Sequence, residues 1–148
     1  GVLLGLDDWR ADSFYCALHL DFLQKKFWQT KYSISFPRIR PAEGVVVPEK
    51  IITDAELVQL ICAYRLFNED VELSISTREP ESFRNNIFKI GVTSMSAGSK
   101  TNPGGYSVDP ESLDQFEISD ERSAKQIAEL ISENNYEPVW KDWDRSFL

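Results

Sequence analysis

Cysteine and histidine are scarce in this sequence, which has two cysteines and one histidine among 148 residues. Cys16 and Cys62 lie far apart and show no metal-ligand spacing, so we interpret them as small buried side chains of a cytoplasmic protein. His19 falls within a predicted helix, where packing or surface roles are usual. The sequence offers no Cys-x-x-Cys pair, no His-x-x-x-His pair and no Ser-His-Asp set, which excludes the common zinc sites and serine hydrolases. We therefore expect no metal-binding residue in this chain.

The sequence also has few basic residues and no long apolar run. Sixteen lysines and arginines stand against twenty-four acidic residues, and the net charge is −8. Nucleic acids and anionic membranes are bound through clustered positive charge, which this composition does not favour. No stretch approaches the roughly 18 consecutive apolar residues that a membrane helix requires. The sequence therefore predicts a protein whose partners are neither nucleic acids nor membranes.

The chain does contain enough apolar material for a core, because 42% of its residues are hydrophobic and 12% are aromatic. Its length predicts one domain. It opens directly on an apolar run, residues 2–6, without an initiator methionine or the charged and apolar regions of a signal peptide. Because a domain rarely begins within a strand, we expect the chain to be a piece of a longer protein.

Apolar periodicity predicts strands and helices in alternation. Short apolar or alternating runs predict strands at residues 2–6, 32–36, 71–76 and 88–95. Helical spacing predicts helices at residues 12–28, 53–67, 81–86 and 123–133, the second and fourth opened by capping boxes. We expect Asp12 or Ser13 to cap the first helix. Its predicted buried stripe comprises Phe14, Ala17, Leu18 and Phe22.

Strands joined by crossover helices are parallel, and four such units make half of the eight that close a (β/α)8 barrel. A doubly wound open sheet would use the same alternation, but its apolar helices on both faces would not accept serines there. The residues expected toward the helices are Ile34, Phe36, Leu73 and Ile75, and those expected toward a polar interior are Ser33, Ser35, Ser74 and Ser76. We therefore predict an α/β fold, the C-terminal half of a TIM-type barrel, over residues 1–108. Residues 109–148 would form a loop, a helix and an aromatic tail packed on it.

The working residues of such barrels lie at the carboxyl ends of the strands. Arg78 continues the inward serine face of the third predicted strand, and an arginine there suits bidentate binding of a carboxylate or phosphate. A structural ion pair with Asp7, Asp8 or Glu79 explains the same residue types equally well. The loop at residues 99–106 has the donors and glycines of an anion cradle, although a plain surface loop is the commoner structure.

Five motifs occur in order along the chain: GVLLGLDDWR, SFPRIRP, ELSISTRE, SAGSKTNPGGY and EPVWKDWD. Together they resemble the C-terminal part of the 2-iminoacetate synthase family, the radical S-adenosylmethionine tyrosine lyases of thiamine biosynthesis. The resemblance covers essentially the whole chain. It implies cleavage of the Cα–Cβ bond of L-tyrosine to 2-iminoacetate (dehydroglycine) and p-cresol, for thiazole formation.

The resemblance also implies cofactors and partners. The family uses S-adenosylmethionine and a 4Fe-4S cluster that is held by a Cys-x-x-x-Cys-x-x-Cys run, and this run is absent from the chain. We therefore expect the chain alone to be inactive and to contribute no catalytic residue. The implied partners are L-tyrosine and thiazole synthase.

The family motifs assign binding roles by position. Arg78 resembles the arginine that holds the carboxylate of the amino-acid substrate, and Ser96 would assist it. Leu3 would pack against adenine, while the main chain of residues 35–38 would contact the adenine edge. Asp8 stands where radical S-adenosylmethionine enzymes usually have glutamate. The implied cofactor-binding residues are Gly1, Leu3, Gly5, Asp8, Ser35, Pro37 and Arg38.

Two alternatives accompany this interpretation. The related tyrosine lyase of hydrogenase maturation shares several motifs, but its C-terminus carries a cysteine cluster, whereas residues 136–148 here contain no cysteine. A noncatalytic module could instead dock thiazole synthase through Trp140 and Trp143, although packing on the barrel's own helices is the plainer explanation of these side chains. A half barrel would leave strand edges unpaired, so we also expect self-association.

Overall fold

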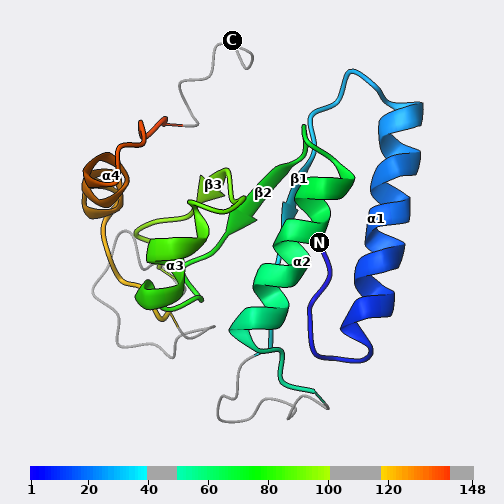
Figure 1. The fold of residues 1–148 in the computed structure, drawn as a ribbon, viewed down its shortest axis with the longest axis horizontal. Coiled ribbons are helices and arrows are strands. Elements are labelled where there is room, and N and C mark those ends of the chain that lie inside the picture. The colour runs from blue at the N-terminus through cyan, green and yellow to red at the C-terminus, as the bar shows by residue number, and fades with distance from the viewer. Residues whose placement is uncertain (40–49, 101–117, 141–148) are drawn as a thin grey trace.

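The computed structural model describes residues 1–39, 50–100 and 118–140. Its elements in chain order are α1 (Trp9–Lys26), β1 (Ser33–Ser35), α2 (Asp54–Phe67), β2 (Glu72–Ile75), α3 (Glu81–Ile87), β3 (Ser94–Met95) and α4 (Ala124–Glu133). The strands form a parallel sheet in the order β1-β2-β3 (Figure 1). The predicted α/β alternation and parallel pairing are confirmed. No helix in these ranges is long and apolar enough to cross a bilayer.

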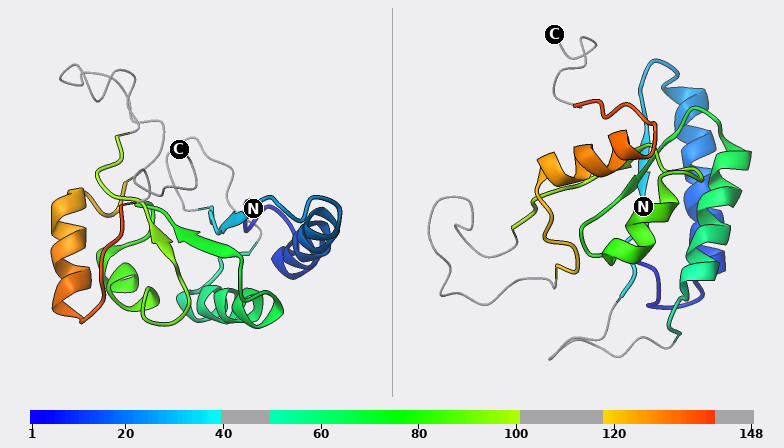
Figure 2. Two further views of the ribbon diagram at one scale, coloured as in Figure 1. Left: turned by 90° about the horizontal axis from the view of Figure 1, so that it is seen from above. Right: turned by 60° about the vertical axis from the view of Figure 1, so that its left-hand side comes forward.

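The two faces of the sheet differ as the alternation predicts. Ile34, Leu73 and Ile75 are buried in one hydrophobic core with Leu57 and Ile61 of α2. The serines of β1 are exposed, and Ser74 of β2 and Ser76 just after it are half-buried. Helices α2 and α3 lie on the same side of the sheet, and no described helix lies over the serine face (Figure 2).

Two predicted strands are wrong in extent. Residues 2–6 contribute only one parallel bridge, between Leu4 and Arg38, because Gly5 adopts a φ of 110° that ends the extended backbone. Residues 88–95 form a strand only at Ser94–Met95. The chain leaves α3 through turns in which the amides of Ile90 and Gly91 donate to the carbonyl of Ile87, so these residues are not extended. The described sheet therefore has three strands, where the sequence predicts four.

The predicted start and buried face of the first helix are also wrong. Helix α1 begins at Trp9, and Asp8 caps it by accepting a hydrogen bond from the Arg10 amide at 3.0 Å. Neither Asp12 nor Ser13 is the cap. The tyrosine hydroxyl of Tyr64 on α2 donates to the Ser13 carbonyl at 2.7 Å, which holds the Ser13 side of α1 against the core. The fully buried residues of α1 are Trp9, Ser13 and Leu20, while Phe14, Leu18 and Phe22 are exposed and only Ala17 of the predicted stripe packs on the core.

The other helix boundaries follow the predicted capping chemistry. Thr53 opens α2 and Ser123 opens α4, each with a reciprocal capping box. In both boxes the hydroxyl accepts from the backbone three residues later, while Glu56 or Gln126 accepts from the cap residue's own amide. The two predicted capping boxes are confirmed.

Candidate functional site

The strands β1, β2 and β3 all end at one edge of the sheet, which we call the carboxyl edge. Ser74 pairs with Ser94, and the Ser96 amide donates to the Ile75 carbonyl at 3.0 Å. This register continues past the strands and sets Ser76 beside Ser96 on the serine face. Arg78 follows Ser76 by two residues, in the turn through which the chain leaves β2 at the carboxyl edge. Ser96 therefore lies next to the end of β2, and Arg78 follows in the turn after that strand.

Burial alternates along the chain that leaves β2. Thr77 and Glu79 are buried, whereas Ser76 and Arg78 are half-buried. The Arg78 amide donates to the Ser76 hydroxyl at 3.3 Å, which supports the turn beyond the strand. Sequence reasoning placed Ser76 in the polar interior but did not assign it to the site. The signal that would have found it is its pairing position beside Ser96, which depends on sheet register rather than on sequence.

Arg38 forms a buried ion pair with Glu79. Its guanidinium Nε donates to both carboxylate oxygens of Glu79 at 3.0 and 3.2 Å, and further bonds reach the Ile52 carbonyl at 2.9 Å and Asp54 at 2.5 Å. Burial alone would lower the pKa of Arg38, but the hydrogen bonds and charges of Glu79 and Asp54 raise it. The Arg38 side chain thus joins the end of β1 to the end of β2 on the helix side.

The predicted cofactor-binding residues come together on two adjacent segments. The Leu4 amide donates to the Pro37 carbonyl at 2.8 Å, so residues 1–4 run beside residues 35–38. A Cβ on Gly1 would lie 2.3 Å from the carbonyl oxygen of Ser35, so only glycine allows this approach. Leu3 is 40% exposed, on the side of the chain opposite the buried Leu4.

Asp8 takes a different place from the other predicted cofactor-binding residues. It caps α1 through its carboxylate, as described above, and this is a sufficient structural reason for an acidic residue at that position. Three further sequence-based predictions lie outside the described residues. They concern Trp143, residues 101–106 of the proposed anion cradle and residues 109–117 of the C-terminal segment.

Sequence reasoning missed a buried charged cluster next to the carboxyl edge. Arg84 of α3 and Asp120 of the segment before α4 are both fully buried and form an ion pair, which Arg122 extends. Burial would raise the pKa of Asp120, but the hydrogen bonds from Arg122 and the charge of Arg84 lower it. No sequence signal identifies this cluster, because its members are far apart in the chain and Asp120 lies in an irregular segment.

The donors of an iron–sulfur cluster are not found in the described part of the chain. No group of three or more His, Cys, Asp or Glu side chains there could hold a metal ion. Cys16 and Cys62 are free, half-buried residues of α1 and α2. Burial and the neighbouring Cys16 raise the pKa of Tyr64, so this phenol stays protonated beside the thiol. The residues described here do not fit a cluster site.

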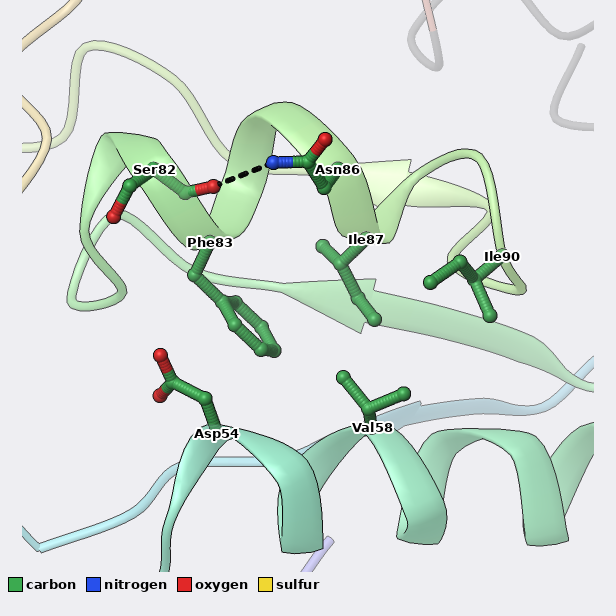
Figure 3. Close-up of a pocket in the computed structure, with 7 residues that line it drawn as sticks. All are labelled: Asp54, Val58, Ser82, Phe83, Asn86, Ile87 and Ile90. Atoms are coloured by element: carbon green, nitrogen blue, oxygen red, sulfur yellow. Dashed lines mark hydrogen bonds between the residues drawn. The ribbon is translucent and has the colours of Figure 1, made fainter.

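Two pockets lie between helices rather than at the carboxyl edge. One, of about 300 Å³, lies between α2 and α3 and is lined by Asp54, Val58, Ser82, Phe83, Asn86, Ile87 and Ile90 (Figure 3). The other, of about 340 Å³, lies between α1 and α2. Both are mainly apolar, and neither includes Arg78 or Ser96 in its lining. Neither of these two pockets therefore overlaps the residues predicted to bind the substrate.

Comparison with known proteins identifies the family of the chain. The sequence model of the Biotin and Thiamin Synthesis associated domain (BATS) matches residues 35–137. The chain belongs to the BATS family. Two curated 2-iminoacetate synthases, from Salmonella typhimurium and Escherichia coli, are each 46% identical to this BATS chain over 145 residues. The matches cover 97% of the chain and 38% of each relative, so the chain spans less than half the length of these proteins. The resemblance predicted from the five motifs is confirmed.

Two solved structures of HydG are similar to this chain in fold and in sequence. The BATS chain superimposes on HydG, a maturase of the FeFe-hydrogenase, with a TM-score of 0.81 and 34% identity, over 92% of this chain and 30% of HydG. HydG from Carboxydothermus hydrogenoformans gives a TM-score of 0.75 and 29% identity, over 90% of this chain and 30% of that one. The BATS chain therefore shares its fold with part of HydG.

Proposed function

We propose that this chain is the C-terminal part of a radical S-adenosylmethionine lyase that cleaves L-tyrosine to 2-iminoacetate and p-cresol for thiamine biosynthesis. The observation that carries the proposal is the 46% identity to two 2-iminoacetate synthases over 97% of the chain. The identity to the two HydG structures is lower, 34% and 29%. The thiamine enzyme is therefore favoured over the hydrogenase-maturation enzyme.

The proposed architecture is the second half of a barrel, with residues 109–148 as an added segment. The one-sided covering of the sheet supports the first part, because barrel helices lie outside the strands. Hydrogen bonds from the Ser119 and Asp120 amides to the Thr77 carbonyl, both 3.0 Å, support packing of the added segment against the strand ends. The two strand edges of such a half would need covering by the rest of the protein or by a second copy.

The role proposed for this chain is to bind the substrate and part of S-adenosylmethionine. Arg78 would hold the tyrosine carboxylate and Ser96 would donate a further hydrogen bond, which fixes the amino acid near the reacting centre. Gly1, Leu3 and Ser35 would line the adenine site, where the close backbone approach and the exposed leucine fit a flat apolar ring. S-adenosylmethionine and the cluster would supply the radical chemistry, and the cluster ligands would come from outside this chain.

The direct test measures tyrosine-dependent p-cresol formation by the full-length protein, reconstituted under anoxic conditions. We expect p-cresol from the full-length protein and none from the isolated 148-residue chain, which lacks the cysteine run. Cleavage of S-adenosylmethionine without any p-cresol would contradict the assigned substrate. Formation of p-cresol by the isolated chain would contradict the proposal that the cluster ligands come from outside this chain.

A second proposed role is docking of thiazole synthase. Val139 and Trp140, next to the end of the described chain, are 82% and 53% exposed, although large apolar side chains are usually covered. We expect the isolated chain to retain thiazole synthase in a pull-down assay. A Trp140→Ala variant should retain less, and an exposed tryptophan on another surface, Trp28, provides the matched control as Trp28→Ala. Equal retention by both variants would exclude this surface.

A further inference from the structure

The buried cluster of Arg84, Asp120 and Arg122 connects three parts of the chain. One terminal nitrogen of Arg84 donates to the Asp120 carboxylate and the other donates to the Ser96 carbonyl. Arg122 donates to the two oxygens of Asp120 at 2.9 and 2.6 Å, and to the side chain of Asn85 at 2.8 Å. Helix α3 is thus joined to the end of β3 by Arg84, and to the segment before α4 by the Asp120 carboxylate and Arg122.

The same segment also fixes the end of β2. The amides of Ser119 and Asp120 both donate to the Thr77 carbonyl, and the Gly98 amide donates to the Arg122 carbonyl at 3.1 Å. Thr77 lies directly before Arg78, and Gly98 lies two residues after Ser96. The segment before α4 therefore bonds to the main chain just before Arg78 and just after Ser96, the two proposed substrate-binding residues.

The burial of the cluster indicates that it fixes the positions of the groups it binds more than it stabilises the fold. Arg84 is fully buried, and its Nε has no hydrogen-bond partner among the described residues. Burial lowers the pKa of Arg84, against the opposing charge of Asp120, although an arginine remains protonated. Buried ion pairs stabilise a fold little compared with apolar residues of the same volume, because desolvation offsets the attraction. What the cluster does supply is directional bonds to specific carbonyl groups.

We propose that Arg84, acting with Asp120, is a positioning residue for the carboxylate-binding pair Arg78 and Ser96. It sets the separation of the β2 and β3 ends so that both side chains reach one α-amino-acid carboxylate. This inference rests on the proposed function, since it specifies how the same site recognises its substrate. It also gives the segment before α4 a part in substrate selection.

Arg65 offers a matched control at the opposite edge of the sheet. Its guanidinium donates to the carbonyls of Glu69, Val71 and Gly91 at 2.6, 3.0 and 3.0 Å, just before β2 and β3 begin. Both arginines therefore link these two strands, Arg65 directly through main-chain carbonyls and Arg84 through the Ser96 carbonyl and Asp120, whose amide donates to the Thr77 carbonyl. Only Arg84 does so beside Arg78 and Ser96.

The experiment compares Arg84→Lys with Arg65→Lys in the full-length protein, with tyrosine as substrate and tyramine, which lacks the carboxylate, as competitive inhibitor. Lysine keeps the charge but cannot bind the Asp120 carboxylate and the Ser96 carbonyl in the same fixed geometry. We expect Arg84→Lys to lower kcat/KM for tyrosine roughly 10- to 100-fold, the scale of a small misplacement of reacting groups. Inhibition by tyramine should change less than about twofold, and Arg65→Lys should leave both values within about threefold of wild type.

A double variant covers the case in which Arg84→Lys does not fold. Arg84→Met combined with Asp120→Leu removes both fully buried charges and leaves Arg122, which is partly exposed, with Asn85 and Glu81 as partners. This variant should fold yet show the same selective loss for tyrosine. Equal losses for tyrosine and tyramine, or equal effects of the Arg84 and Arg65 variants, would overturn the positioning role alone. A wild-type protein that forms no p-cresol would overturn the proposed function and this inference with it.

Discussion

Replacing Arg78 by alanine should lower kcat/KM for tyrosine cleavage by the full-length protein about 100- to 1,000-fold. Truncating one partner of a desolvated, hydrogen-bonded charge pair costs about 3–4 kcal/mol, and each 1.4 kcal/mol is a factor of about ten. The loss should appear in both KM and kcat, because an unanchored carboxylate lets the amino acid shift relative to the reacting centre. The measurement is p-cresol formation over a range of tyrosine concentrations.

Arg78→Lys should recover part of the loss, since lysine restores the charge but not two parallel hydrogen bonds. Arg10→Ala is the matched control. Arg10 is an exposed arginine of α1 that pairs with Glu56 at 3.2 Å, outside the proposed site, and its loss should change kcat/KM by less than about threefold. Normal turnover by Arg78→Ala would remove the carboxylate-binding role from this residue. Tyramine inhibition should be the same in wild type and Arg78→Ala.

Local signals predicted most of the fold. Alternation of Ser33, Ile34 and Ser35 predicted which face of β1 is buried, because side chains of a strand point to opposite faces in turn. The capping boxes at Thr53 and Ser123 predicted two helix starts, since they satisfy amides within four residues of sequence. The predicted roles of Arg78 and Ser96 remain proposals.

Features that depend on distant contacts could not be predicted in this way. The buried face of α1 is set by its contacts with α2, and the apolar residues Phe14, Leu18 and Phe22 of the predicted stripe are exposed instead. The motif predicts main-chain contacts to adenine for the strand that ends at Arg38, and it does not indicate that the Arg38 side chain is buried against Glu79, 41 positions away. The same limit applies to Asp120, whose carboxylate binds Arg84 of α3, 36 positions away.

The largest stability effect is expected at the buried pair of Arg38 and Glu79. Both side chains are almost fully buried, and Glu79 accepts bonds from Nε and from a terminal nitrogen of Arg38. Glu79→Ala would leave the Arg38 charge buried with only the exposed carboxylate of Asp54 nearby. We expect the free energy of unfolding to fall by about 3–5 kcal/mol, measured by urea denaturation followed by circular dichroism. Glu69→Gln, which changes an exposed carboxylate before β2, should shift it by less than about 0.5 kcal/mol.

A double replacement separates stability from geometry at this pair. Arg38→Met combined with Glu79→Leu removes both buried charges, and it should recover more than half of the stability lost in Glu79→Ala, because apolar packing replaces a desolvated ion pair at little net cost. A double variant as unstable as the single one would mean that the bonds from Arg38 to Ile52 and Asp54 are the stabilising contacts. If the double variant is stable but cleaves tyrosine poorly, the pair serves to fix the ends of β1 and β2 next to Arg78. Two buried arginines, Arg38 and Arg84, would then hold the carboxyl edge from the helix side, one for each neighbouring pair of strands.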